Sequence, residues 1–187
     1  LIKPMKKSSF VLLCTLLLFA CSENADESNS NDSNPRTEFI QTTNQPKTSE
    51  VISTLIADLK SQKFELQNRD IHPMDSFYGW KEETQYIVQG NGMKVYYFKR
   101  TEAKPENYYP DFTLTVFQFK SEDEAQLCLD KIEEPAKTGN VTRASEPLKN
   151  PQAILRKGNA VFLFSTRAEM FRGYIEDCIK RIEGYSK

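Results

Sequence analysis

The stretch DFTLTVFQFK, Asp111–Lys120, indicates the fold class of this chain more clearly than any other segment. In its middle, odd- and even-numbered positions both carry apolar side chains, as Leu114, Val116 and Phe117 show. A strand with one solvent-exposed face alternates apolar and polar residues, whereas a strand buried on both faces does not. We therefore predict a central strand here.

Two hairpins are predicted on either side of this strand. Glycine and asparagine adopt the backbone conformations of tight hairpin turns at little cost, so Gly-Asn pairs between apolar runs are strong turn signals. The upstream pair of strands is expected within Gln85–Arg100, around Gly90-Asn91-Gly92, and the downstream pair within Ala153–Thr166, around Lys157-Gly158-Asn159. A further short strand is expected at Phe64 and Leu66.

Three amphipathic helices are predicted around these strands, because apolar residues recur there every three or four positions. Ser121 is the candidate N-cap of the second helix, with Glu124 at the capping-box position, and Pro135 is expected to end that helix. The helices are expected from Thr48 to about Gln62, from Ser121 to Pro135, and from Ala168 to about Glu183.

The order helix, strands, helix, hairpin, helix favours an α+β fold. We expect a mainly antiparallel sheet of about 5–6 strands with about three packed helices, in layers. The segment from Thr48 to Lys187 has 140 residues, which is enough for one globular domain with its own core. We therefore predict a single α+β domain at residues 48–187.

The first twenty residues have the layout of an export signal. Lysines at positions 3, 6 and 7 precede an uncharged, apolar run from Phe10 to Ala20. As a helix, this 11-residue run would reach roughly 16 Å, which is too short for a hydrocarbon core of about 30 Å. Residues 1–20 are therefore predicted to be a signal peptide.

The junction Leu18-Phe19-Ala20-Cys21 resembles the lipobox of bacterial lipoproteins. The resemblance implies that Cys21 is acylated, becomes the first residue of the mature chain, and anchors it in the membrane through lipid such as palmitate. Several acyl chains on one residue hold a protein durably at a membrane, where a single chain does not. The tract Ser22–Glu27 resembles the acidic export tag of surface lipoproteins of the Bacteroidetes, although Asn24 and Ala25 interrupt the acids.

These resemblances imply a protein of the cell envelope, anchored in the outer membrane, on either its periplasmic face or the cell surface. Residues 21–47 are predicted to be the lipidated cysteine and a disordered tether, because the segment is polar, with Pro35 and Pro46 and almost no apolar residues. The domain that follows has 20 basic against 21 acidic residues. This balance gives no support for nucleic acid as a partner.

Cys128 and Cys178 are the remaining cysteines of the mature chain. Outside the cytoplasm such a pair can form a disulfide if the two Cα atoms lie within about 7 Å. Each cysteine also lies on the apolar stripe of a predicted helix, and free cysteine is commonly buried, so both alternatives stay open. His72 is the only histidine, and we predict no catalytic residue, no metal site and no cofactor.

Aromatic residues near strand ends form the candidate binding surface. Rings with polar tips can build a platform for a glycan, a peptide or a partner protein. Some of these residues must instead face the core, because alternate positions of a strand point inward. The candidates are Phe77, Tyr78, Trp80, Tyr97, Tyr108 and Tyr109.

The C-terminal stretch RKGNAVFLFSTRAEMFRGYIEDCIKRIEG, Arg156–Gly184, is similar to the closing hairpin and helix of small exported α+β domains such as the PsbP and Mog1 group. This similarity implies topology alone, because no catalytic motif accompanies it.

We therefore expect a non-catalytic, lipid-anchored envelope protein whose domain binds another envelope component, a protein or a glycan. A lipoprotein that binds a small molecule or glycan around Trp80 is the alternative, and an enzyme with an unfamiliar site is the second alternative.

Overall fold

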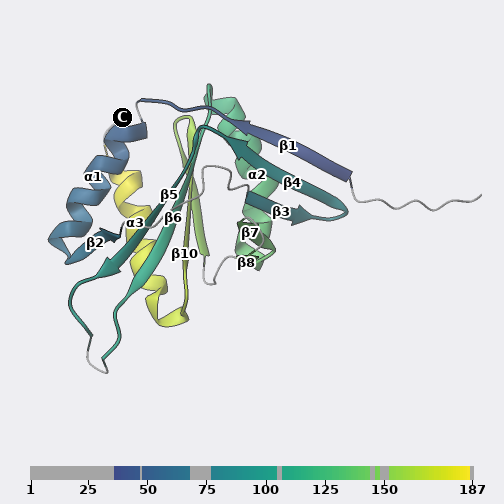
Figure 1. The fold of residues 1–187 in the computed structure, drawn as a ribbon. Helices are drawn as coiled ribbons and strands as arrows, with labels where there is room; N and C mark the ends of the chain where they lie inside the picture. Colours follow the sequence, from purple (N-terminus) through teal and green to yellow (C-terminus); the bar gives the residue numbers. More distant parts are fainter. Residues whose placement is uncertain are drawn as a thin grey trace, which may run out of the picture. The chain divides into compact units, whose positions relative to one another are not determined.

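The computed structural model describes residues 36–46, 48–67, 77–104, 107–143, 146–147 and 152–185. They form three α-helices, one short 3-10 helix and ten strands in two sheets (Figure 1). The predicted α+β class, with mainly antiparallel pairing, is confirmed. The predicted signal peptide, Cys21 and His72 lie outside the described residues.

Sheet B is antiparallel throughout and has the order β2-β5-β6-β10-β9. Its strands are β2 (Phe64–Gln67), β5 (Met93–Arg100), β6 (Asp111–Gln118), β9 (Gln152–Lys157) and β10 (Ala160–Thr166). The stretch DFTLTVFQ is β6, in the middle of this sheet, and its residues from Leu114 to Gln118 are buried on both faces. The predictions of the central strand and of the β9–β10 hairpin are therefore confirmed.

Sheet A has the order β1-β4-β3-β7-β8, and its β1–β4 pair is parallel. Its strands are β1 (Arg36–Thr42), β3 (Phe77–Lys81), β4 (Thr84–Gly90), β7 (Val141–Arg143) and β8 (Glu146–Pro147). The prediction that the tether extends to Lys47 is wrong, because β1 pairs with β4 along its whole length. Ile40 is buried, and Glu38 forms an ion pair with Lys131, so the folded domain already includes Arg36.

The predicted hairpin around Gly90-Asn91-Gly92 is also wrong, because β4 and β5 belong to different sheets. The end of β1 crosses the β4–β5 connection at this point, and Thr43 N–H donates to the Gln118 carbonyl at 2.7 Å. A Cβ atom on Gly92 would meet the backbone of Thr43 and would lie 2.7 Å from the Gln118 carbonyl oxygen. These glycines therefore make room for a backbone crossing between the two sheets.

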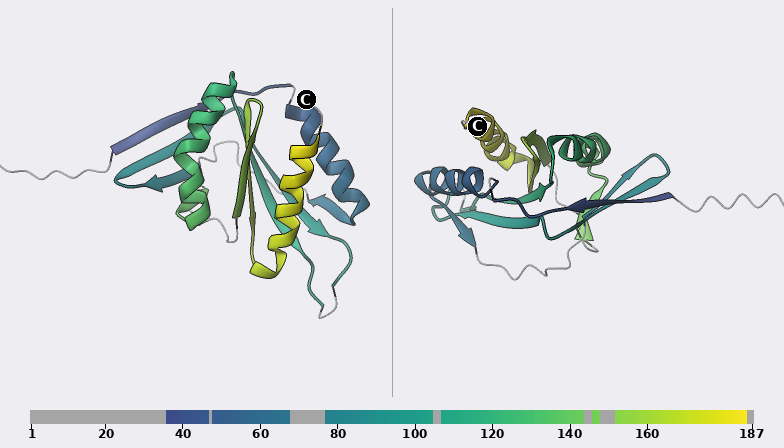
Figure 2. Two further views of the ribbon diagram at one scale, coloured as in Figure 1. Left: turned by 180° about the vertical axis from the view of Figure 1, so that it is seen from behind. Right: turned by 90° about the horizontal axis from the view of Figure 1, so that it is seen from above.

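The helices divide the interior into two core clusters, which lie on opposite faces of β10. The helices are α1 (Thr48–Ser61), α2 (Glu122–Thr138) and α3 (Arg172–Gly184), the last preceded by the 3-10 turn η1 (Glu169–Phe171). One cluster includes residues of α1 and α3 (the α1/α3 core), and the other includes residues of α2 (the α2 core). Phe162 and Phe164 point into the α1/α3 core, whereas Val161 and Leu163 point into the α2 core. Figure 2 shows the β9–β10 hairpin standing between α2 and α3.

Helix α2 starts as predicted but ends later. The Ser121 hydroxyl accepts from the Glu124 N–H at 3.2 Å, which confirms the predicted N-cap, whereas the Glu124 carboxylate accepts from the Lys120 N–H at 3.0 Å and not from that of Ser121. Pro135 does not end the helix, since α2 continues to Thr138 and Gly139 closes it in the left-handed conformation. Pro135 removes one N–H but is itself buried against Gly79 of β3, so packing outweighs the lost hydrogen bond.

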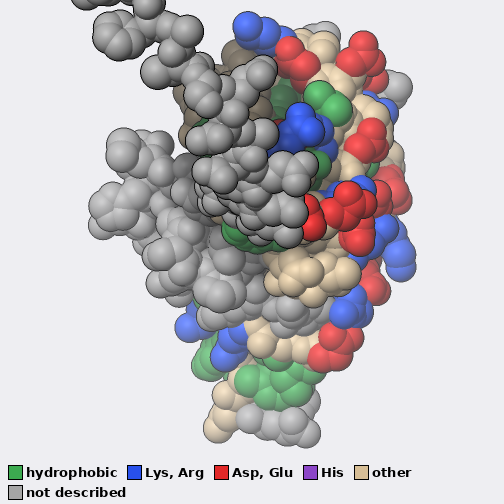
Figure 3. Space-filling view, turned by 90° about the vertical axis from the view of Figure 1, so that its right-hand side faces the viewer, with side chains coloured by type: hydrophobic (Ala, Val, Ile, Leu, Met, Phe, Trp, Pro, Cys, Tyr) green, Lys and Arg blue, Asp and Glu red, His purple; other side chains and the backbone are tan. Residues whose placement is uncertain are grey.

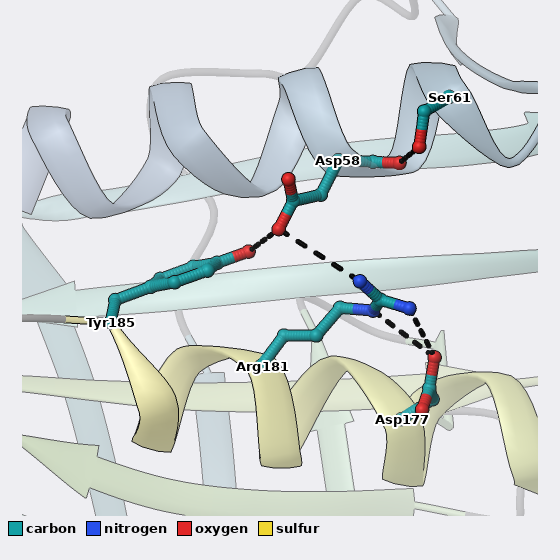
Figure 4. A network of polar contacts seen from close by, with 5 residues as sticks. All are labelled: Asp58, Ser61, Asp177, Arg181 and Tyr185. Carbon is teal, nitrogen blue, oxygen red and sulfur yellow. Dashed lines mark hydrogen bonds and ion pairs between the residues drawn. The ribbon is translucent and has the colours of Figure 1, made fainter.

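A polar network joins α1 to α3 at the surface of the α1/α3 core (Figure 4). The Tyr185 hydroxyl donates to the Asp58 carboxylate at 2.6 Å, and Arg181 lies between that carboxylate and Asp177, at 4.0 Å and 3.0 Å. Lys157 of β9 donates to the Ile182, Glu183 and Tyr185 carbonyls and so satisfies the C-terminal end of α3. Together these contacts fix α3 against its neighbours.

In the described part of the chain, none of the helices combines the length and the apolar character that crossing a bilayer requires.

Candidate functional site

The predicted aromatic platform is not one surface. Phe77 is fully buried in the α2 core, where its ring contacts Phe117 at 5.2 Å between centroids, so its prediction as a surface residue is wrong. Tyr97 is on sheet B and donates its hydroxyl proton to Asp111 at 2.7 Å. The side chain of Tyr78 lies outside what the structure describes.

The two remaining tyrosines belong to the β5–β6 connection. Tyr108 packs on Phe171 of the 3-10 turn, at 5.7 Å between ring centroids. Tyr109 is exposed, and the Lys99 ammonium lies 5.3 Å from its ring centroid. Trp80 belongs to β3 in the other sheet, so the structure separates it by strand and by sheet from Tyr97.

Trp80 lies instead on the outer face of sheet A, the face opposite α2. On the inner face, Phe77, Gly79 and Val88 point toward α2, and Gly79 meets Pro135. Side chains of a strand alternate between faces, so Trp80 and Ile87 point outward. The parallel β1–β4 register places Phe39 beside Ile87.

Two large rings are exposed on this outer face, Phe39 at 61% and Trp80 at 41% of their surface. The prediction that Trp80 is at the surface is consistent with its exposure. Sequence reasoning missed Phe39, because this residue was assigned to the tether. The only signal was the pair Phe39-Ile40 within an otherwise polar segment, which is typical of a short strand buried on one side.

On β1, β3 and β4 of sheet A, every outward-facing residue whose side chain the structure describes is uncharged. These residues are Thr37, Phe39, Gln41, Trp80, Gln85, Ile87 and Gln89. Charged residues make up 27% of the whole chain, so about two charges would be expected among seven surface positions. By contrast, Figure 3 shows acidic and basic side chains interspersed on another side of the molecule.

A second feature is a pocket of about 390 Å³ at the edge of sheet B, where β9 runs between α2 and α3. Gln152, the first residue of β9, lines it. Gln152 is only 9% exposed, and neither its Oε1 nor its Nε2 has a hydrogen-bond partner in the described part of the chain. None of the predicted aromatic residues lines this pocket, and no signal in the sequence marks Gln152.

Cys128 and Cys178 are free thiols in the structure and belong to different core clusters. Of the two alternatives that the sequence left open, the structure therefore has the free thiols. Burial raises the pKa of the Cys178 thiol to about 12, and burial raises the pKa of the Cys128 thiol as well. Both thiols are protonated near neutral pH and so are poor nucleophiles.

Among the described residues, no group of three or more His, Cys, Asp or Glu side chains is close enough to hold a metal ion. The hydrogen bond from Lys131 lowers the pKa of the Glu38 carboxyl, as the hydrogen bond from Arg172 lowers that of Glu169. The Glu38–Lys131 pair joins β1 to α2, and the Lys131 ammonium also lies 4.9 Å from the centroid of the Tyr86 ring. We therefore assign the Glu38–Lys131 pair a structural role, which is to hold β1 against the rest of the domain.

No protein-family profile, no curated protein and no solved structure matches this chain, so its own residues are the basis for assigning a function.

Proposed function

We propose that this chain is a lipid-anchored protein of the bacterial cell envelope, and that its domain binds another envelope protein without catalysing a reaction. The lipobox-like junction Leu18-Phe19-Ala20-Cys21 supports the anchor. The observation that carries the binding role is the uncharged outer face of sheet A, from which Phe39 and Trp80 project.

The composition of this face favours a protein partner. The centres of protein interfaces are depleted of charged residues and enriched in aromatic ones, and tryptophan is prominent among the residues that carry binding energy. The outer face of sheet A has this composition. Phe39 and Trp80 are exposed, Ile87 lies on the strand between theirs, and the neighbouring side chains are glutamine and threonine. A patch of this kind on a soluble domain typically marks an interaction site.

The face also argues against a buried small ligand at Trp80. Ligand pockets enclose most of their ligand, whereas Trp80 projects from a strand of an open sheet face. The pocket at β9 is lined by residues of α2, β9 and α3 and does not include Trp80. We therefore assign Trp80 to contact with a protein surface.

The lipid anchor is tested by metabolic labelling with a palmitate analogue in bacteria that express the full chain. The wild type should be labelled and Cys21→Ala should not, because the cysteine thiol is the acylated group. Cys14, which precedes the junction, provides a matched control: Cys14→Ala should be labelled like the wild type. Labelling of Cys21→Ala would disprove the anchor.

The binding face is tested by crosslinking from an introduced cysteine in intact cells. Gln41 is exposed and lies two residues beyond Phe39 on the same face, so Gln41→Cys can carry a thiol-linked photocrosslinker. The buried thiols of Cys128 and Cys178 should not react in the folded protein.

The control variant is Leu127→Cys, because Leu127 is 53% exposed on α2, away from this face. We expect one defined protein adduct from position 41 and none of that mass from position 127. The same adduct from both positions, or no adduct from position 41, would contradict a partner bound at the outer face of sheet A.

A further inference from the structure

Among the residues that the structure describes, the carboxamide of Gln152 has no hydrogen-bond partner, and its Oε1 and Nε2 are both buried. Buried polar groups in folded proteins are nearly always paired, because an unpaired one loses its hydration and gains nothing in return. One donor group and one acceptor are therefore left unused at the start of β9.

Gln152 lines a pocket of a size suited to a ligand, and its two carboxamide atoms are buried beside it. The volume of about 390 Å³ falls within the range of roughly 300 to 1,000 Å³ that is typical of ligand sites. Its apolar lining comes from Ala136, Ala153, Ile154 and Ile179, and its charged lining from Lys137, Glu176, Lys180 and Glu183. Because charges of both signs line it, the pocket does not select a ligand by net charge.

The pocket also follows the free edge of a sheet. β9 is the last strand of sheet B, and its one described strand neighbour is β10. Every second residue of such a strand directs its N–H and C=O groups away from the sheet. The three residues of β9 that line the pocket, Gln152 to Ile154, span about 10 Å.

We propose that this groove, formed by α2, β9 and α3, binds an extended peptide segment, which adds to sheet B as a strand beside β9 and pairs with Gln152. This groove is at the edge of sheet B, whereas the proposed protein-binding face is on sheet A. The peptide proposal therefore does not depend on the function proposed above.

An extended peptide matches this groove chemically. A residue in a β-strand directs its own N–H and C=O to the same side, and a side-chain amide presents a C=O and an NH₂ group in the matching order. Gln152 can therefore accept from the N–H and donate to the C=O of one peptide residue. The terminal torsion of glutamine is broad, so the carboxamide can turn toward a ligand without leaving its rotamer.

Other ligand classes use less of the groove. An apolar molecule would leave both carboxamide atoms unpaired, and a simple ion would use only the donor or only the acceptor. Addition of a strand uses both, and it also pairs the outward backbone groups of β9. The peptide's side chains would then alternate between the apolar lining and the charged rim.

The test uses a random linear heptapeptide library displayed on phage, selected against the full mature protein. Selected peptides are synthesised, and their affinity is measured by fluorescence anisotropy. Gln152→Leu should weaken binding at least ten-fold, because it removes two hydrogen bonds to the peptide. The matched control Gln126→Leu should bind like the wild type, because Gln126 pairs with Asp130 on α2 and does not line the pocket.

Gln152→Leu should also raise the melting temperature of the free protein, since leucine fills similar space without a buried unpaired amide. The loss of binding would then not be due to misfolding. On the ligand side, N-methylation of alternate peptide residues should abolish binding in one register and spare it in the other, because only alternate N–H groups face β9.

Three outcomes would overturn the proposal. One is the absence of any selected peptide that binds in solution. Another is that Gln152→Leu leaves the affinity for the peptide unchanged. If Trp80→Ser then abolishes peptide binding, the peptide binds at the outer face of sheet A instead. The third is tolerance of N-methylation at every position.

Discussion

Gly92→Ala tests whether the Gly90–Gly92 segment is a crossing between two sheets. The φ angle of Gly92 lies outside the left-handed region, so alanine is compatible with its backbone conformation. The obstacle is space, because a Cβ atom would lie 2.6 Å from the Thr43 carbonyl carbon and 2.7 Å from the Gln118 carbonyl oxygen. These are backbone atoms, which cannot rotate away as a side chain can.

The size of the effect follows from the contacts at this crossing. Accommodating the methyl group separates the strands that exchange the Thr43 to Gln118 and Gln118 to Gly92 hydrogen bonds, at 2.7 and 3.0 Å. Each lost hydrogen bond costs about 1 kcal/mol, and overpacking a rigid site costs a further 1 to 3 kcal/mol or so. The free energy of unfolding should fall by about 3 to 5 kcal/mol.

Urea unfolding followed by circular dichroism measures this change, in a Cys21→Ser background so that the protein is not acylated. Gly173→Ala is the matched control, because Gly173 lies in α3 and a Cβ atom there would have no neighbour within 4 Å. This control should stabilise the protein by about 0.5 to 1 kcal/mol, through the helix propensity of alanine. A loss below about 1 kcal/mol for Gly92→Ala would refute the crossing and favour an ordinary turn.

Three further predictions concern the α3 contacts and the thiols. Burial, and after it the hydrogen bond to Asp58, raises the pKa of the Tyr185 phenol in the folded protein. The stability that depends on the neutral phenol is therefore complete below about pH 10, the usual pKa of tyrosine, and is lost as the pH rises above it. Tyr185→Phe should lower the free energy of unfolding by about 1 kcal/mol at pH 7. Urea midpoints should show a smaller difference between the variant and the wild type at pH 11, and an equal difference at both pH values would contradict the link between Tyr185 ionisation and stability. Lys157→Met should cost about 1 to 2 kcal/mol and speed amide hydrogen exchange in the last turn of α3, and unchanged exchange would contradict the capping role. Differential alkylation, read by peptide mass spectrometry, should find Cys128 and Cys178 unmodified in the native protein and both modified in urea without reductant. A disulfide between them would instead keep both unmodified in urea until a reductant is added.

The elements themselves could be predicted because their signals are local. The central strand, the β9–β10 hairpin and the three helices each have an apolar period and a cap or turn within a few residues. The Ser121 cap is an example, since the donor and the acceptor are three residues apart.

Strand partners were less predictable. The turn signal at Gly90–Gly92 is real, but its glycines are required by Thr42 and Thr43, which lie nearly fifty positions away in the sequence. β1 was missed for the same reason, because its pairing with β4 and the Glu38–Lys131 ion pair are long-range contacts that a polar segment does not reveal.

The candidate sites show the same limit. Aromatic composition identified Trp80, but only strand alternation and register show that Phe77 faces the core and that Phe39 faces outward. The unpaired carboxamide of Gln152 depends on what surrounds it in the folded domain, and one glutamine in a sequence looks like any other.

The proposed function rests on the outer face of sheet A, and the most direct test combines the Gln41→Cys crosslinker with loss of the two exposed rings. Phe39→Ser and Trp80→Ser together remove the rings without touching the buried face of the sheet. We predict that the adduct formed from position 41 in intact cells disappears in this variant, while its urea midpoint stays close to that of the wild type. An adduct that persists at the wild-type yield, with both rings absent, would contradict partner binding at this face.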